Sequence, residues 1–285
     1  MDTPDDLLRH AAVALAAALG LEPREARLEA QILLCHALKQ PRSWLIAHDR
    51  DALDPGQAVV FLALLERRLA GEPIAYITGE REFYGLSFQV TPAVLIPRPE
   101  TELLVELALA RLPENHAWRV LDLGTGSGAI ALTLAKLRPQ AAVTAVDISP
   151  VALAVARDNA QRLATANVDF VQSAWFAGLP PHRRFDLIVA NPPYIAAGDP
   201  HLAQGDVRFE PSTALASGLD GLDDIRAIIG GAAVHLAPGG WLLFEHGYDQ
   251  AEACRALLGQ AGFCEVASAD DLAGIARVTL GKFIQ

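Results

Sequence analysis

The stretch Arg119-Val-Leu-Asp-Leu-Gly-Thr-Gly-Ser-Gly128, followed by the apolar run 129–135, decides the fold class. Residues 119–123 predict a short buried strand, and residues 129–135 predict a helix. The three glycines between them permit positive φ and let the backbone approach a ligand closely. A strand, a glycine-rich turn and a helix in this order form the first unit of a nucleotide-binding α/β fold.

The details of this loop favour one nucleotide cofactor. A second strand, residues 142–146, ends in Asp147, where an acid can accept hydrogen bonds from both hydroxyls of a ribose. The spacing Gly-x-Gly-x-Gly lacks the third glycine of the dinucleotide fingerprint Gly-x-Gly-x-x-Gly. Asp122, just before the loop, would repel a pyrophosphate but suits a cofactor with an amino group and a sulfonium. The loop therefore favours S-adenosylmethionine over NAD, with a purely structural cap as the alternative role of Asp122.

A second motif, Asn191-Pro192-Pro193-Tyr194, follows the apolar strand predicted at residues 185–190. Two consecutive prolines fix φ and lack backbone donors, so they are excluded from a helix or a central strand. The resulting rigid turn can hold a planar NH₂ group, because the Asn191 side-chain oxygen and a proline carbonyl can accept its two hydrogens while Tyr194 covers its face. The simpler alternative is a turn with a buried tyrosine. The complete tetrapeptide at a strand end favours a site.

Periodicity divides the chain into three parts. Residues 1–72 predict a small helical bundle, residues 73–98 a connector with a β-hairpin at 83–90, and residues 99–285 an α/β domain. In the last part helices alternate with strands, which predicts a doubly wound, mainly parallel sheet with helices on both faces. Helices are expected at 5–19, 25–38, 43–47 and 57–69, and strands at 119–123, 142–147, 168–172, 185–190, 240–245, 263–268 and 275–281.

Composition and charge narrow the class of protein. No stretch reaches the roughly 18 apolar residues that a membrane span requires. The three cysteines are widely separated, which indicates reduced thiols and a cytoplasmic location, and no Cys or His spacing indicates a metal site. The net charge of −11 and the lack of a basic stripe disfavour direct binding of nucleic acid. The pairs Arg67-Arg68 and Arg183-Arg184 are expected on solvated faces, and we expect a monomer.

Five segments together resemble the HemK/PrmC family of protein-(glutamine-N5) methyltransferases, which act on peptide-chain release factors. The resemblance extends from about Pro73 to Phe283 and covers the N-terminal segment more loosely. Asn-Pro-Pro-Tyr is shared with adenine-N6 methyltransferases, so the blocks at 95–102 and 204–211 are the more specific ones. The segments are Asp122-Leu-Gly-Thr-Gly-Ser-Gly128, Asp147, Asn191-Pro-Pro-Tyr194, Leu95-Ile-Pro-Arg-Pro-Glu-Thr-Glu102 and Gln204-Gly-Asp-Val-Arg-Phe-Glu-Pro211.

The resemblance implies a class I S-adenosylmethionine-dependent methyltransferase domain, with the N-terminal helices recognising a release factor that presents a Gly-Gly-Gln loop. It places Trp175 beside the adenine and Glu210 near the active centre, with a structural hydrogen bond from Glu210 to the Asn-Pro-Pro-Tyr loop as the alternative. The implied catalytic residues are Asn191, Pro192 and Tyr194. The implied substrate-binding residues are Asn191, Pro192, Pro193, Tyr194 and Glu210, and the implied cofactor-binding residues are Asp122, Gly124, Thr125, Gly126, Ser127, Gly128, Asp147, Trp175 and Asn191.

One position departs from the family pattern. Ala174 stands where the family usually has an acidic residue that can bind the adenine amino group, which puts one cofactor contact in doubt. Two other functions are weighed against glutamine methylation. One is an adenine-N6 methyltransferase that flips a base into the same pocket. The other is a non-catalytic assembly factor that keeps the cofactor-binding fold.

Overall fold

A computed structural model describes residues 3–114 and 116–284. The chain divides into two compact units, residues 1–80 together with 203–209, and residues 81–202 together with 210–285. The outermost residues of the predicted first and last domains, 1–2 and 285, lie outside the described residues. No helix in the described part of the chain is long and apolar enough to cross a membrane.

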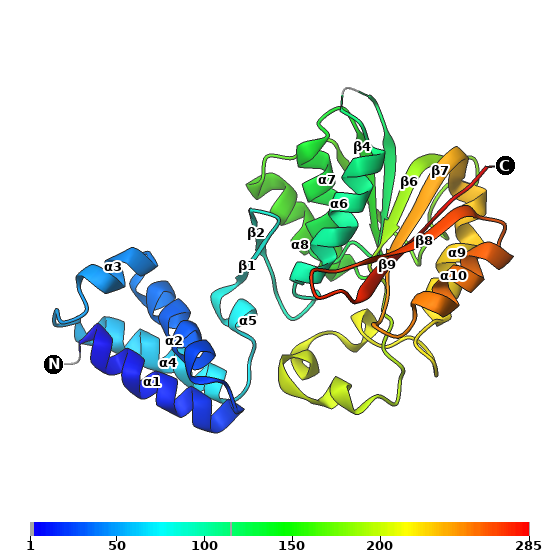
Figure 1. The fold of residues 1–285 in the computed structure, drawn as a ribbon. Coiled ribbons are helices and arrows are strands. Elements are labelled where there is room, and N and C mark those ends of the chain that lie inside the picture. Colours follow the sequence, from blue (N-terminus) through cyan, green and yellow to red (C-terminus); the bar gives the residue numbers. More distant parts are fainter. Residues whose placement is uncertain (1–2, 115, 285) are drawn as a thin grey trace. The chain divides into compact units, whose positions relative to one another are not determined.

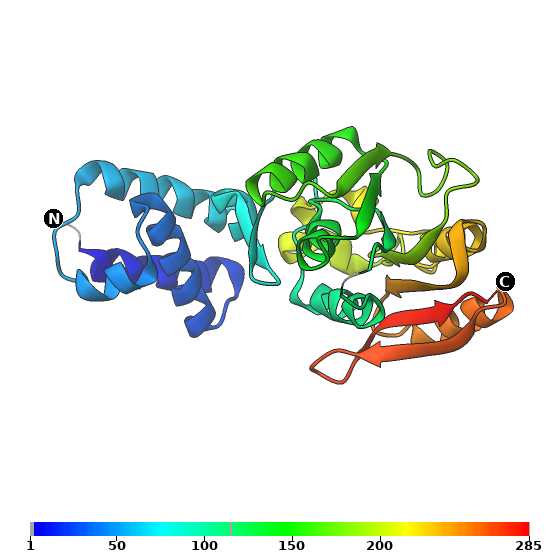
Figure 2. The same ribbon diagram turned by 90° about the horizontal axis from the view of Figure 1, so that it is seen from above.

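The first unit is the predicted helical bundle (Figure 2). Its core contains the fully buried side chains Leu15, Leu33, Leu34 and Phe61. Thr3 caps the first helix by accepting a hydrogen bond from the backbone nitrogen of Asp6, and proline opens the first, second and fourth helices. A short fifth helix was not predicted. The helices are α1 (Pro4–Leu19), α2 (Pro23–Leu38), α3 (Arg42–Ala47), α4 (Pro55–Leu69) and α5 (Ile74–Thr78).

Arg68 explains why residues 203–209 belong to this unit. Its guanidinium forms a bidentate pair with Glu29 of α2, at 2.8 and 2.9 Å, and a third bond of 2.8 Å to Asp206. Arg68 is only 4% exposed, so its expected place on a solvated face was wrong. A buried guanidinium needs this complete set of acceptors, because leaving one of its donors unpaired away from water is costly.

The second unit is built on a seven-stranded sheet with the order β5-β4-β3-β6-β7-β9-β8 (Figure 1). The first five of these strands are parallel, and β9 is antiparallel to both β7 and β8. The predicted doubly wound, mainly parallel sheet is confirmed. The strands are β3 (Arg119–Leu123), β4 (Ala142–Asp147), β5 (Val168–Gln172), β6 (Phe185–Ala190), β7 (Leu236–Glu245), β8 (Cys264–Asp270) and β9 (Ala276–Lys282).

Strand β7 begins four residues before the predicted start at 240, at Leu236. Leu236 pairs with Phe185, and the register then shifts before Trp241 pairs with Leu187. The sequence Pro238-Gly-Gly240 reads as a strand break, and the irregular pairing absorbs it.

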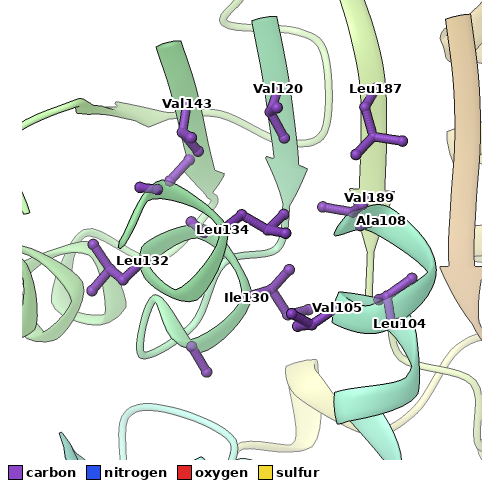
Figure 3. Close-up of a cluster of buried hydrophobic side chains, with 14 of the residues drawn as sticks. Leu104, Val105, Ala108, Val120, Ile130, Leu132, Leu134, Val143, Leu187 and Val189 are labelled. Atoms are coloured by element: carbon purple, nitrogen blue, oxygen red, sulfur yellow. The ribbon is translucent and has the colours of Figure 1, made fainter. Parts of the chain in front are cut away.

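Helices cover both faces of the sheet. Alternate residues of the strands point to opposite faces, so Val120 belongs to the core that includes side chains of α6 and α7, while Leu121 belongs to the core that includes side chains of α9 and α10. Figure 3 shows the first of these two cores, where side chains of α6 and α7 meet those of β3, β4 and β6. The helices are α6 (Glu102–Arg111), α7 (Ala129–Leu137), α8 (Pro150–Arg162), α9 (Asp223–His235) and α10 (Ala251–Gln260).

Two smaller features complete the list of elements. Strands β1 (Glu80–Phe83) and β2 (Leu86–Gln89) pair through a two-residue turn in which Tyr84 and Gly85 both have positive φ, the geometry of a tight hairpin. The long connection after β6 contains three short 3₁₀ helices. These are Pro200–Ala203, Gly205–Phe209 and Ser212–Ala214.

Candidate functional site

The carboxyl ends of β3, β4, β5 and β6 line one cavity of about 600 Å³, a size typical of small-molecule sites. Strands β3 and β6 are neighbours although β4 follows β3 in sequence, so this is the switch point where such sheets bind ligands. The four predicted segments do converge here. The predicted residues that line the cavity are Gly124, Thr125, Gly126, Ser127, Asp147, Trp175, Asn191 and Pro193.

The glycine loop is shaped by three positive φ angles and by hydrogen bonds to β4. Gly124, Gly126 and Gly128 have φ values of 72°, 54° and 85°, which favour glycine. The backbone nitrogens of Gly124 and Thr125 both donate to the carbonyl of Val146, at 2.9 Å each. Gly128 lies outside the cavity lining. A Cβ atom there would come within 2.9 Å of the Leu132 side chain, so this glycine serves the packing of α7.

Asp147 lies at the wall of the cavity with its carboxylate already oriented. One oxygen accepts from the backbone nitrogen of Gly126 and the other from that of Ser149, both at 2.9 Å. These two bonds fix the side chain between the glycine loop and the start of α8. An oriented acid at the end of the second strand is what a ribose needs.

Asp122 is fully buried below the loop and lies outside the cavity lining. Its carboxyl accepts a 2.7 Å hydrogen bond from the Thr125 hydroxyl, which is the structural cap considered as an alternative. Burial raises the pKa of Asp122 to about 7, with the Thr125 bond opposing this and the charge of Asp147 adding to it. A direct contact between Asp122 and the cofactor stays a prediction.

Trp175 forms another wall of the cavity. Its φ of 50° is unusual for a bulky residue, and its ring lies so close to Gly124 that a Cβ there would be 3.3 Å from it. The indole nitrogen donates to the carboxylate of Asp224 at 3.2 Å, and both Ala174 and Asp224 line the cavity. The sequence interpretation missed Asp224. It lies 49 residues after Trp175, at the start of α9, and no motif marks it.

The Asn-Pro-Pro-Tyr turn is anchored through a buried acid that the sequence interpretation also missed. The side-chain nitrogen of Asn191 donates to the Thr101 hydroxyl at 3.1 Å, and this hydroxyl donates to Glu245 at 2.6 Å. The Tyr194 hydroxyl donates to the other oxygen of Glu245 at 3.1 Å. Pro192 and Tyr194 lie outside the cavity lining, and the Tyr194 ring packs against the core under α9 and α10. The predicted stacking of Tyr194 on a substrate amide stays a prediction.

Burial governs the titration of this network. Glu245 is 2% exposed, and burial raises its pKa, while the hydrogen bonds from Thr101 and Tyr194 and the charge of Arg277 lower it. Burial also raises the pKa of Tyr194, and the nearby negative charge of Glu245 adds to this rise. The tyrosine is therefore a hydrogen-bond donor rather than a phenolate.

Glu210 is buried and tied to the other specific block. It forms an ion pair with Arg98 and accepts a 3.2 Å bond from the backbone nitrogen of Ile96. These contacts hold the segment 95–102, which contains Thr101. The predicted bond from Glu210 to the Asn-Pro-Pro-Tyr loop, and its role in substrate binding, stay predictions.

The cavity fits a nucleoside cofactor. It combines a glycine loop with free approach to the backbone, an oriented acid at the end of β4 and an aromatic wall. Within residues 3–114 and 116–284, no cluster of three or more His, Cys, Asp or Glu side chains could hold a metal ion.

Known proteins match nearly the whole chain. The model of the PrmC N-terminal domain matches residues 6–79, and that of the methyltransferase small domain matches residues 100–207. The release factor glutamine methyltransferase of Bordetella pertussis is 56% identical over 91% of this chain and 96% of its own length. Those of Burkholderia pseudomallei and Vibrio cholerae are 54% and 51% identical, over 90% of this chain and 91% and 89% of their own lengths. The chain belongs to the release factor glutamine methyltransferase family. The family resemblance read from its motifs is confirmed.

Solved structures outside the family share the fold. A T. thermophilus 16S rRNA N2 methyltransferase, determined with AdoMet and guanosine, has a TM-score of 0.55 at 23% identity, covering 72% of this chain and 49% of its own. The catalytic domain of hMettl16 has a TM-score of 0.57 at 17% identity, covering 78% of this chain and 82% of its own. The second unit of this release factor glutamine methyltransferase family member therefore has the class I methyltransferase fold.

Proposed function

We propose that this protein transfers a methyl group from S-adenosylmethionine to the side-chain amide nitrogen, N5, of the glutamine in the Gly-Gly-Gln loop of peptide-chain release factors. The observation that carries the proposal is Asn191. It lies on the wall of the glycine-loop cavity, in a chain that is more than half identical to enzymes named for this reaction.

The cofactor is held by the strand ends. Asp147 accepts from the ribose hydroxyls, the loop from Gly124 to Ser127 lies along the cofactor, and Trp175 lies beside the adenine. Asp224, which holds Trp175, supplies a carboxylate on the side of the cavity where Ala174 supplies none. When bound, S-adenosylmethionine supplies a methyl group on a positively charged sulfur, an electrophile that needs no further activation by the protein.

The chain's own residues align the nucleophile. An amide nitrogen is a poor nucleophile because its lone pair is delocalised into the carbonyl. The Asn191 oxygen and the Pro192 carbonyl accept its two hydrogens, which fixes the amide plane and raises electron density on the nitrogen. Tyr194 limits rotation of this turn through its bond to Glu245. No strong base is required before attack, since the nitrogen becomes acidic once it is alkylated.

The helical bundle, residues 1–72, recognises the release factor. One glutamine side chain offers too little surface for selection among cellular proteins, so a second contact region is needed. The connector, residues 73–98, joins the bundle to the catalytic domain, residues 99–285, which binds the glutamine and the cofactor. The enzyme acts as a monomer in the cytoplasm without binding nucleic acid directly. Its three free cysteines and its net charge of −11 support this assignment.

Parallel incubations with methyl-labelled cofactor test the proposal. The enzyme is given a release factor, duplex DNA or ribosomal RNA under the same conditions, and label is expected only on the release factor. Asn191→Ala is expected to reduce turnover by several powers of ten, within the roughly 7–11 kcal/mol that orientation can contribute. Label on nucleic acid alone would establish the adenine methyltransferase instead, and no transfer to any of the three would favour the assembly factor.

A further inference from the structure

The acid of the buried network is also placed to control how Asn191 meets its substrate. We propose that Glu245, acting through Thr101, is a positioning residue that fixes the Asn191 side-chain amide with its oxygen toward the substrate. This inference rests on the proposed function. It assigns a role to Thr101 in the block at 95–102 and to an acid at the end of β7, which no motif marks.

The direction of the hydrogen bonds carries the argument. The Thr101 hydroxyl donates to Glu245 across the 2.6 Å contact. This hydroxyl has one hydrogen, and it can then only accept from its other neighbour. The neighbour is the Asn191 side chain, 3.1 Å away, which must therefore present its NH₂ group to Thr101.

The consequence lies at the cavity. An amide that turns its NH₂ group toward Thr101 turns its oxygen the other way. Asn191 and Thr101 both line the cavity, so this oxygen is available to a ligand there. A substrate carboxamide brings an NH₂ group and needs an acceptor. If the amide were flipped, two NH₂ groups would face each other and the pairing would be lost.

Tyr194 ties the far end of the same turn to the same acid. Its hydroxyl donates to the second oxygen of Glu245 at 3.1 Å, so one carboxylate holds the first and the last residue of Asn-Pro-Pro-Tyr. Glu245 is fully enclosed, with its two oxygens engaged by these two hydroxyls. Burial raises the pKa of Glu245, while the hydrogen bonds from Thr101 and Tyr194 and the charge of Arg277 lower it. A buried acid with two hydroxyl donors is a costly arrangement for packing alone, since an apolar residue fills space without desolvation of a polar group.

Substitutions of matched shape separate positioning from packing. Glu245→Gln keeps the volume but places an NH₂ group in the network, so Thr101 is no longer forced to donate toward residue 245. Thr101→Val removes the hydroxyl at equal volume, and Thr101→Ser restores it. We expect Glu245→Gln and Thr101→Val each to lower kcat about 10- to 100-fold, the range for lost hydrogen bonds to charged groups, and Thr101→Ser to stay within a few-fold of wild type.

The full-length enzyme is assayed with an intact release factor, alongside calorimetry with S-adenosylmethionine and thermal unfolding. The affinity for the cofactor should change little in the Thr101 pair, whereas Thr101→Val should lower the Tm because a buried oxygen of Glu245 loses its donor. Because Thr101 and Glu245 act in one chain, the Thr101→Val, Glu245→Gln double variant should be no slower than the slower single variant. Multiplying effects would overturn the proposal, as would Thr101→Val with wild-type kcat or Thr101→Ser as slow as Thr101→Val. If wild-type enzyme fails to methylate the release factor in this assay, the proposed function fails instead.

Discussion

The buried Asp122 carboxyl should make the stability of the sheet unit depend on pH. Burial raises its pKa from 3.8 to about 7 in the folded protein. The folded state therefore binds this proton more tightly than the unfolded chain does. The resulting contribution to stability is fully present below the unfolded pKa and is lost progressively as the pH rises through 7.

The size of the effect follows from the shift. Each pKa unit corresponds to about 1.4 kcal/mol, so at pH 8 the ionised Asp122 costs about 4 kcal/mol relative to a neutral side chain. At pH 5 the loss of stability is about 2 kcal/mol. The unfolded chain is already stabilised by ionising this side chain, whereas the folded state keeps it protonated. Asp122→Asn has the same shape, and its oxygen can still accept from Thr125. The free energy of unfolding of the variant, relative to that of the wild type, should therefore rise by about 2–3 kcal/mol between pH 5 and pH 8.

Urea unfolding at the two pH values measures this gain. Three of the four tryptophans, Trp118, Trp175 and Trp241, lie in the sheet unit, so fluorescence follows its unfolding. The gap is the free energy of unfolding of the variant minus that of the wild type. Only its change between the two pH values is used, so any constant effect of the new amide cancels. A gap that is equal at pH 5 and pH 8 would refute a raised pKa. A gap that moves in favour of the wild type at high pH would mean that the ionised acid stabilises the loop.

Three further outcomes are expected. Asp147→Ala should weaken binding of S-adenosylmethionine about 10- to 100-fold by calorimetry, because a charged acceptor for the ribose is lost; unchanged affinity would remove Asp147 from the site. Asp224→Ala should weaken binding of the cofactor several-fold and alter the fluorescence of Trp175, whose indole nitrogen loses its acceptor. A cofactor affinity equal to wild type would show that Asp224 does not replace the acid missing at Ala174. Val59→Asp on the exposed face of α4 should raise the KM for intact release factor with cofactor affinity intact, while the exposed Leu272→Asp should not; equal KM values would argue against recognition by the bundle.

The strand ends were predictable because local patterns mark them. Gly124, Asp147 and the prolines after Asn191 each mark the end of an apolar strand in the sequence. Parallel strands bring their carboxyl ends to one edge of the sheet. The sequence alone therefore predicts the sheet, the position of the cavity and the lining residues that lie at these strand ends. The start of β7 was missed because an irregular pairing overrides its proline and glycines.

The supporting acids could not be predicted in the same way. Glu245 ends an apolar strand, where an acid is expected to be exposed. It is buried instead, and its hydrogen-bond partners Thr101 and Tyr194 lie 144 and 51 residues away in the sequence. Asp224 opens a helix, where an acid is expected for capping alone. Likewise, Arg68 is in a pair of arginines that resembles a solvated face, and its burial depends on Asp206, 138 residues later. Each of these contacts exists only because tertiary packing brings distant segments together.

Fragment masses of a release factor after incubation with the enzyme and S-adenosylmethionine test the central claim most directly. The account predicts one added methyl group, on the side-chain nitrogen of the glutamine in the Gly-Gly-Gln loop, and none when that glutamine is replaced by glutamate. It also predicts no addition with Asn191→Ala enzyme over the same time. A methyl group on another residue, or an equal addition to the glutamate-substituted factor, would contradict the account.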